Sequence, residues 1–166
     1  MTNEELKDRA IKFVNTWEPL VKKGNVGERQ HDREFMSDFY EVFGISRVNY
    51  RQGFEYKVKI EGSNKRIDSL LPGVLIIEME SQGHDIVNDA TSGYPQAARY
   101  AYALPDDLKP RYILASDFEN FYLRDPLTDH VWTTTLSDFV ANIDMFAFLN
   151  GYEQHVQRHQ VEVNKK

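Results

Sequence analysis

The sequence has no cysteine among its 166 residues and no long apolar run. The absence of cysteine excludes disulfides and cysteine-based zinc sites, and it favours a cytoplasmic setting. No segment approaches the length of a membrane span, and the charged start, MTNEELKDRAIKF, is not typical of a secretory signal peptide. We therefore expect a cytoplasmic protein with no membrane contact.

Basic residues are in the minority, and the formal net charge is −6 at pH 7. This charge argues against a protein that coats nucleic acid through bulk electrostatics. It leaves open a contact with DNA through a local basic patch, and it suits a site that gathers carboxylates around a cation. The length predicts one domain, in which about two-thirds of the unfolded surface can be buried.

Apolar residues recur at spacings of three and four in three parts of the chain, which predicts three amphipathic helices. They cover residues 4–22, about 27–43 and about 137–149. Thr135 or Ser137 would cap the last of them, because a hydroxyl at that position accepts a hydrogen bond from a free backbone N–H.

Strand signals occupy the middle of the chain. A further helix, with Pro95 in its first turn, is expected before residue 104. The expected order predicts an α/β fold over residues 1–152. Residues 153–166 lose the apolar stripe, which predicts a frayed helix or a linker toward another region. The expected strands are GFEYKVKI, RIDSLL, VLIIEM, RYILAS, NFYLRD and HVWTTT.

Acidic residues lie at the end of the most apolar strand. Glu78 and Glu80 are two residues apart, so they share one face. A three-residue loop over 72–74 would place Asp68 directly opposite Glu78, whereas a two-residue turn would shift the register. Clustered carboxylates titrate upward unless a cation lies among them, and Mg²⁺ needs only one or two protein carboxylates. The alternative is a solvated sheet edge, in which the acids pair with Lys57, Lys59 or Arg66.

Two further features lie on the predicted helices. Glu28 precedes Phe35 by seven residues and therefore lies on the apolar face, where an acid needs either a partner or the helix dipole. Gln96 and Tyr100 are four residues apart on the helix after the acidic strand, so they share a face and can hydrogen-bond. Such a pair is also common as a structural feature.

The order of these features resembles the PD-(D/E)xK nuclease superfamily. The pattern begins with an acid. About ten residues later comes a Glu-x-Glu segment at the end of an apolar strand, and Gln-xxx-Tyr follows on the next helix. The sequence is most similar to the N-terminal endonuclease domain of MmeI-like restriction–modification enzymes, which join a nuclease, an adenine-N6 DNA methyltransferase and a target-recognition region. The similar segments span roughly residues 5–152 and are FVNTWEPL, GERQHDREFMSDFYEVFGI, RIDSLLPGVLIIEMESQGHDI, YPQAARY, RYILASDFENFYLRD and TLSDFVANIDMFAFLNGY.

The resemblance implies a restriction-endonuclease-like fold, with a mixed central sheet flanked by helices. It implies that Asp68 and Glu78 bind Mg²⁺ or Mn²⁺, that Glu28 is an additional acid, and that Gln96 and Tyr100 form the accessory motif. DNA would be the substrate of a metal-dependent phosphodiester hydrolysis. The methyltransferase and target-recognition regions of the same polypeptide would be its partners, and S-adenosylmethionine would bind only in the methyltransferase region.

Glu80 departs from the family pattern, because it stands where the family has lysine. That lysine is expected to orient the attacking water and to stabilise charge on the phosphate. Glu80 would instead act as a ligand of a second metal ion. Alternatively, the change would leave a nuclease-like domain without catalysis, which contacts DNA or a protein within an adenine-N6 methyltransferase. The sequence leaves both interpretations open.

Other candidate functions and residues have weaker support in the sequence. A hydrolase that uses two carboxylates on a sugar is a third hypothesis, but the Gln-xxx-Tyr pair does not call for it. His84 suits a loop cap or a general base. His155 and His159 have metal-ligand spacing but lie in a polar tail without a third ligand. A set of basic residues near the acidic strand suits either DNA-backbone contact or a solvated strand face: Lys57, Lys59, Lys65 and Arg66.

Overall fold

A computed structural model describes the backbone of residues 1–24 and 26–165, and their side chains except those of Glu28 and residues 159–165. Within this part, five α-helices, two short 3-10 helices and six strands follow one another. In chain order they are α1 (Asn3–Lys22), α2 (Glu28–Val42), α3 (Arg47–Tyr50), η1 (Arg51–Gly53), β1 (Phe54–Ile60), β2 (Ser63–Leu71), β3 (Leu75–Met79), α4 (Gly93–Ala103), β4 (Tyr112–Ser116), β5 (Asn120–Asp125), β6 (His130–Thr135), η2 (Ile143–Leu149) and α5 (Tyr152–Lys165).

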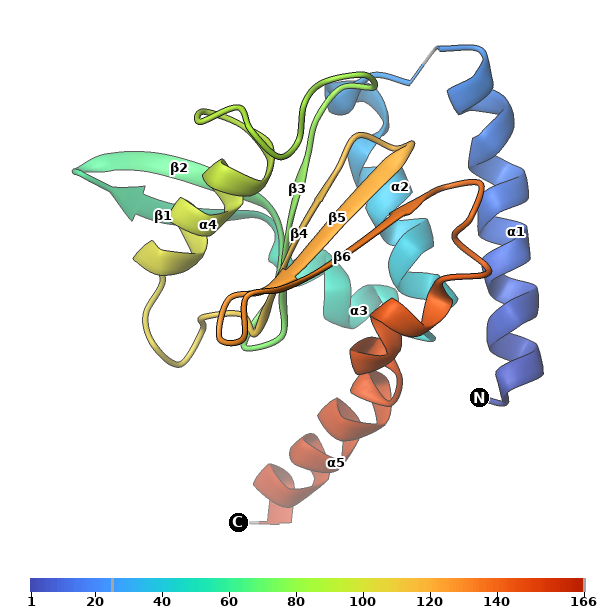
Figure 1. The fold of residues 1–166 in the computed structure, drawn as a ribbon. Helices are drawn as coiled ribbons and strands as arrows, with labels where there is room; N and C mark the ends of the chain where they lie inside the picture. Colours follow the sequence, from blue (N-terminus) through green and yellow to red (C-terminus); the bar gives the residue numbers. More distant parts are fainter. Residues whose placement is uncertain (25, 166) are drawn as a thin grey trace.

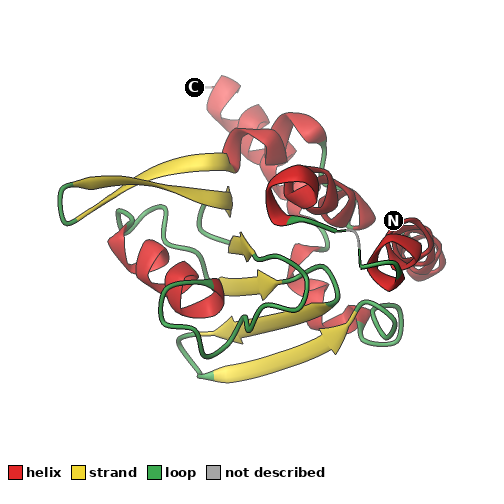
Figure 2. Cartoon of the chain, turned by 90° about the horizontal axis from the view of Figure 1, so that it is seen from above, coloured by secondary structure: helices red, strands yellow, loops and turns green. Residues whose placement is uncertain are grey.

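The six strands form one mixed sheet in the order β1-β2-β3-β4-β5-β6. Strands β3 and β4 are parallel, and every other neighbouring pair is antiparallel. Helix α4 makes the crossover between the two parallel strands, and it covers one face of the sheet, while α1 and α2 lie on the other (Figures 1 and 2). The prediction of an α/β fold with a mixed sheet flanked by helices is confirmed.

The sheet divides the core into two layers because successive strand residues point to opposite faces. Ile76 of β3 and Ile113 of β4 belong to the layer under α4. The larger layer lies under α1 and α2, and it is rich in aromatic rings, which supply much apolar area and edge-to-face contacts. Its buried rings include Phe13, Trp17, Phe35, Phe39, Phe118, Phe121, Phe139 and Phe146.

The β2–β3 hairpin has the three-residue loop that the sequence argument required. Leu71 pairs with Leu75, and Ser69 pairs with Ile77, so Pro72, Gly73 and Val74 form the loop. Gly73 has a φ of 76°, which glycine adopts without steric cost. The strand ends that carry the acidic residues therefore lie side by side in the predicted register.

The last predicted helix was wrong. Residues 137–142 form turns, and a kinked 3-10 helix follows at Ile143–Leu149 in place of an α-helix from about 137. The apolar spacing was correct, since Phe139, Phe146 and Leu149 are buried, but it fits two turns pressed onto the core equally well. The Thr135 hydroxyl accepts a hydrogen bond from the Asp138 N–H, so it closes the first of these turns and does not cap the predicted α-helix.

The C-terminal segment is helical. Helix α5 is attached to the body of the molecule through Glu153, whose carboxylate accepts hydrogen bonds from the Ser46 N–H and the Asn49 amide. Among the described helices, none is both long and apolar enough to cross a membrane.

Candidate metal-binding site

The candidate site lies where β2 and β3 part. Their backbone pairing ends at Ser69 and Ile77, and two acidic side chains take over the hydrogen bonds beyond it. The Asp68 N–H donates to Glu78 Oε2 over 2.9 Å, and the Met79 N–H donates to Asp68 Oδ2 over 2.8 Å. Asp68 and Glu78 thus face each other across the two strands, as predicted.

Both carboxyl groups hold their protons more tightly than usual. Burial, the largest cause, raises the pKa of Asp68 to about 6, although hydrogen bonds with Glu78 and Met79 oppose this shift. Burial and the charge of Asp68 raise the pKa of Glu78 well above its ordinary value. Glu78 is 1% exposed. A proton shared between two close carboxyls is the expected response when no cation offsets their charge.

The solvated alternative does not fit this arrangement. Neither Asp68 nor Glu78 forms an ion pair with Lys57, Lys59 or Arg66, nor with any other cation that the structure describes. Burying carboxylates without a positive partner is costly. The negative charge of this pair is therefore not balanced by any cation that the structure describes.

Helix α4 brings the accessory pair to the carboxylates. Pro95 lies in its first turn, as predicted, and one turn of helix separates Gln96 from Tyr100. Gln96 Nε2 donates to Glu78 Oε1 over 2.9 Å. Tyr100 is buried beside them, and its pKa is raised by burial and then by the charge of Glu78. Gln96 therefore fixes the orientation of Glu78, and Tyr100 lies close enough for the charge of Glu78 to act on its hydroxyl.

Glu80 makes different contacts. Its backbone N–H donates to the Ser116 carbonyl over 2.8 Å, which continues the β3–β4 pairing beyond Met79. Its Oε2 accepts a hydrogen bond of 3.2 Å from the N–H of Gly93, the first residue of α4, and its Oε1 lies 3.9 Å from His84 Nε2. A carboxylate is favoured at a helix N-terminus, where the free N–H groups and the dipole present positive charge.

Gly93 makes this contact available. Its φ is 55°, and a Cβ there would come within 2.5 Å of the Ile86 carbonyl oxygen. Only glycine lets the loop before α4 fold this closely onto the helix start. The Glu80 carboxylate therefore anchors the helix that carries Gln96 and Tyr100.

The donor set suits a hard divalent cation at Asp68 and Glu78. Both offer carboxylate oxygens, which Mg²⁺ prefers, and Mg²⁺ completes its shell with water when one or two protein carboxylates bind it. Among the residues that the structure describes, no group of three or more acidic or histidine side chains is arranged to hold a metal ion. The described geometry thus brings two of the predicted acids together and holds Glu80 on the helix start.

Comparison with known families places this geometry in context. The model of the family "MmeI, N-terminal domain" matches residues 8–166. The chain belongs to this family. No curated protein and no solved structure matches it. Membership supports an N-terminal domain of a restriction–modification enzyme.

Asp32 is a neighbour of the candidate site that sequence reasoning missed. It lies on α2, and its charge contributes to the raised pKa of Asp68. Burial also raises the pKa of Asp32 itself. The sequence spacing could have identified Asp32, because it follows Glu28 by four residues and therefore lies on the same face of the helix. The Glu28 side chain, predicted as an additional acid, lies outside the described residues.

The histidines of the MmeI-type domain have separate roles. His84 Nε2 lies 2.6 Å from Ser92 Oγ and 3.0 Å from Asp89 Oδ2, so it ties together the loop before α4. This agrees with a loop cap. His155 is exposed on α5, and the side chain of His159 lies outside the described residues.

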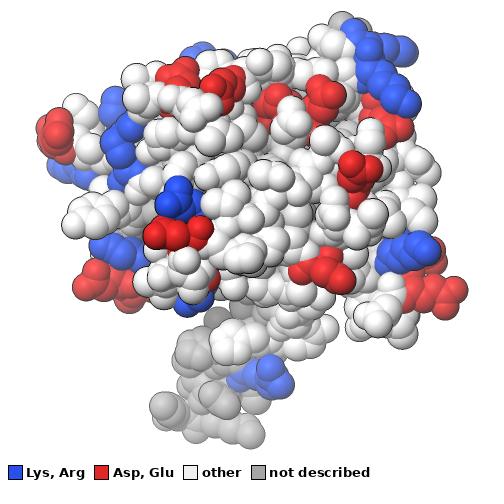
Figure 3. Space-filling view, viewed as in Figure 1, with Lys and Arg blue, Asp and Glu red and all other residues white. Residues whose placement is uncertain are grey.

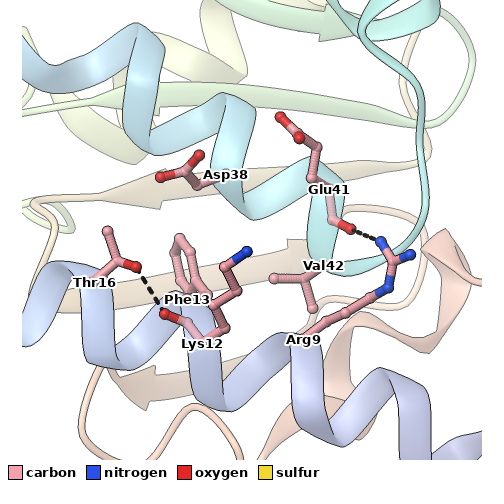
Figure 4. Close-up of a pocket in the computed structure, with 7 residues that line it drawn as sticks. All are labelled: Arg9, Lys12, Phe13, Thr16, Asp38, Glu41 and Val42. Atoms are coloured by element: carbon pink, nitrogen blue, oxygen red, sulfur yellow. Dashed lines mark hydrogen bonds between the residues drawn. The ribbon is translucent and has the colours of Figure 1, made fainter.

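A separate groove of about 430 Å³ lies between α1 and α2 (Figure 4). Its wall includes Arg9, which donates to the Glu41 carbonyl over 2.9 Å, and Thr16, which donates to the Lys12 carbonyl. Neither Asp68 nor Glu78 lines it. This groove is therefore separate from the candidate site at Asp68 and Glu78.

Proposed function

We propose that this chain is the metal-dependent DNA endonuclease domain of a restriction–modification polypeptide. The observation that carries the proposal is the contact between the half-buried Asp68 and the buried Glu78, for which the described residues supply no cationic partner, in a domain of the MmeI N-terminal family. The methyltransferase and target-recognition regions, with S-adenosylmethionine, belong to other parts of such a polypeptide.

In this proposal Asp68 and Glu78 hold Mg²⁺ or Mn²⁺. The cation, when bound, neutralises charge that builds on the phosphate and lowers the pKa of a water molecule. The protein residues supply position. Gln96 holds one oxygen of Glu78, and the N–H of Met79 holds one oxygen of Asp68, so each carboxylate keeps a fixed orientation.

A plasmid-cleavage assay tests the proposal. The chain is incubated with supercoiled DNA and Mg²⁺ or Mn²⁺, beside Asp68→Asn and Glu78→Gln, which keep the size of each side chain. Cleavage by the unmodified chain that both substitutions abolish supports the proposal. Cleavage that survives either substitution would overturn the assignment of the site.

A second function, a nuclease-like module without catalysis, is favoured by Glu80. This residue stands where the superfamily has lysine, and its carboxylate is engaged by Gly93 at the start of α4. In this case Glu80 positions the helix, and the domain contacts DNA or a protein without cutting.

Two substitutions at position 80 separate the functions. Glu80→Lys restores the family residue, whereas Glu80→Gln keeps an oxygen that accepts the Gly93 N–H. Cleavage by Glu80→Lys alone, with an inactive unmodified chain, supports the module without catalysis. Isothermal titration with Mg²⁺ adds a second readout: if Glu80 is a cap, Glu80→Gln leaves the affinity unchanged, and if it is a ligand, the affinity falls.

A further inference from the structure

The β1–β2 hairpin extends beyond α4 at one edge of the sheet (Figure 1). It turns through Glu61 and Gly62, with φ values of 51° and 80°, and Ile60 pairs with Ser63 across the turn. Two positive φ values in a two-residue loop are typical of a type I′ turn, which matches the strand twist and fixes the register. The side-chain positions along the hairpin are therefore well defined.

Three basic side chains share one face of this hairpin. Lys57 lies directly opposite Arg66, and Lys59 is two residues from Lys57 on the same strand. All three are exposed. Lys65 points to the opposite face, where it pairs with Val58. In Figure 3, Lys and Arg side chains gather at the left edge of the molecule, over this hairpin.

This arrangement is electrostatically unfavourable in isolation. Like charges directly opposite each other on paired strands destabilise the pairing. None of the three cations forms an ion pair with a carboxylate in the described part of the chain, although acids outnumber bases overall. By contrast, Arg33, Arg111 and Arg124 each have an acidic partner. The hairpin face is thus an unmatched patch of positive charge.

The patch leads to the candidate site. Arg66 and Asp68 are two residues apart on β2, so strand alternation puts them on the same side, about 7 Å apart along the strand. Buried carboxylates repel a phosphate group, and the net charge of −6 repels DNA as a whole. A polyanion can approach Asp68 and Glu78 only where local cations offset this repulsion.

We propose that Lys57, Lys59 and Arg66 form a DNA-backbone surface that guides a phosphate toward Asp68 and Glu78. This inference rests on the proposed function, because it names the surface by which the same site receives its substrate. The contacts are with phosphates, so they set position and affinity and read no bases.

Salt dependence of DNA binding tests this surface. Binding of a fluorescent duplex to the full chain is measured by anisotropy from 25 to 200 mM salt in EDTA, which prevents cleavage. Each lost phosphate contact reduces the slope of log K against log salt by about 0.9. The triple variant K57Q/K59Q/R66Q is expected to reduce the slope by about 2.7.

Two controls keep the comparison specific. The variant K7Q/K12Q/K23Q removes the same charge from exposed positions on α1 and at its C-cap, and K65Q removes a cation from the other hairpin face. Both are expected to leave the slope within about 0.5 of the unmodified chain. A slope that falls equally in the two triple variants would overturn the proposal, because bulk charge would then explain it. Relief of the like-charge pair also predicts a melting temperature of K57Q/K59Q/R66Q no lower than that of the unmodified chain.

The outcome is separable from that of the proposed function. A changed slope with no Mg²⁺-dependent cleavage would keep the DNA surface and reject the nuclease. Cleavage with an unchanged KM for DNA in K57Q/K59Q/R66Q would keep the nuclease and reject the surface.

Discussion

Two groups of buried carboxylates lie at the ends of the central strands, and they differ in how their charge is balanced. Asp125 at the end of β5 is 3% exposed and accepts a hydrogen bond of 2.6 Å from Arg111. Asp117 after β4 is 1% exposed and accepts N–H groups from Gly83, Glu119 and Asn120. Asp68, which is half-buried, and the buried Glu78 face each other, and no cation among the described residues pairs with either of them.

The pKa values record this difference. Burial acts to raise the pKa of Asp125, but the hydrogen bond from Arg111 lowers it below its ordinary value. The pKa values of Asp68 and Glu78 are raised, because burial is not offset by positive charge. Burial of an acid alone therefore does not mark a functional site. Asp117 is also buried without a cation, but three backbone N–H groups bind it, whereas Asp68 and Glu78 lie against each other and both have raised pKa values.

The largest expected effect comes from replacing one acid of each group with asparagine and comparing the two variants. Asp68→Asn should reduce Mg²⁺ binding and any cleavage to background, because it removes a proposed ligand. Asp125→Asn should lower the melting temperature, because Arg111 loses its partner, yet leave Mg²⁺ affinity unchanged. Titration calorimetry and thermal melting check the two outcomes. Loss of Mg²⁺ binding in Asp125→Asn would remove the distinction between the groups.

The pH dependence of stability should have opposite signs in the two groups. Because the folded pKa of Asp68 is about 6, above the ordinary 3.8, its contribution to stability is complete below pH 4 and is lost as the pH rises through 6. The shift corresponds to a loss on the order of 3 kcal/mol. Asp125, with its lowered pKa, contributes stability above pH 4 that is lost on acidification.

Urea unfolding in EDTA between pH 3 and pH 8 measures the free energy of unfolding, and it shows both the decline toward high pH and the decline toward low pH. Asp68→Asn should flatten the decline toward pH 8, and Asp125→Asn should flatten the decline toward pH 3. An unchanged alkaline limb in Asp68→Asn would show that the carboxyl pair is not the source of that decline.

Addition of Mg²⁺ should stabilise the chain at pH 8 and not the variants of the proposed site. A ligand that binds only the folded state at 100 times its Kd adds about 2.7 kcal/mol to the free energy of unfolding. Glu78→Gln should show no such gain, whereas Asp125→Asn should show the full gain. Equal gains in all three proteins would place the ion elsewhere.

The smallest expected effect concerns Gln96. Gln96→Leu removes the hydrogen bond to Glu78 and should lower the free energy of unfolding by about 1 kcal/mol. It should also weaken Mg²⁺ binding by about tenfold, as loss of a hydrogen bond that orients a ligand does. Gln154→Leu on α5 is the matched control, and an equal loss of affinity there would contradict a specific role for Gln96.

The sequence predicted the Asp68–Glu78 pair because strand alternation and loop length together determine register. It also predicted α4 from Pro95 onward, since proline favours the first turn. It did not predict the contact between Glu80 and Gly93, because a carboxylate two residues beyond a strand can turn toward the metal site or toward the helix. Only the path of the loop over residues 81–92, closed by Gly93, decides between them.

Asp32 was missed for a related reason. The helical period identified its neighbour at position 28 as facing inward, but the period does not say which strand end a helix turn will meet. The helix expected from about 137 failed because an apolar period near three to four is common to α-helices and to successive tight turns on a core.

The parallel pairing of β3 with β4 has a consequence for how the site forms. Glu78 pairs with Ala115, and the chain between them includes all of α4. Closing so long a loop costs entropy before its contacts repay it, and such pairings form slowly. We therefore expect Glu78 to reach its final position late in folding, after the aromatic layer under α1 and α2, so that a nascent chain does not bring Asp68, Glu78 and Gln96 together until β4 has docked.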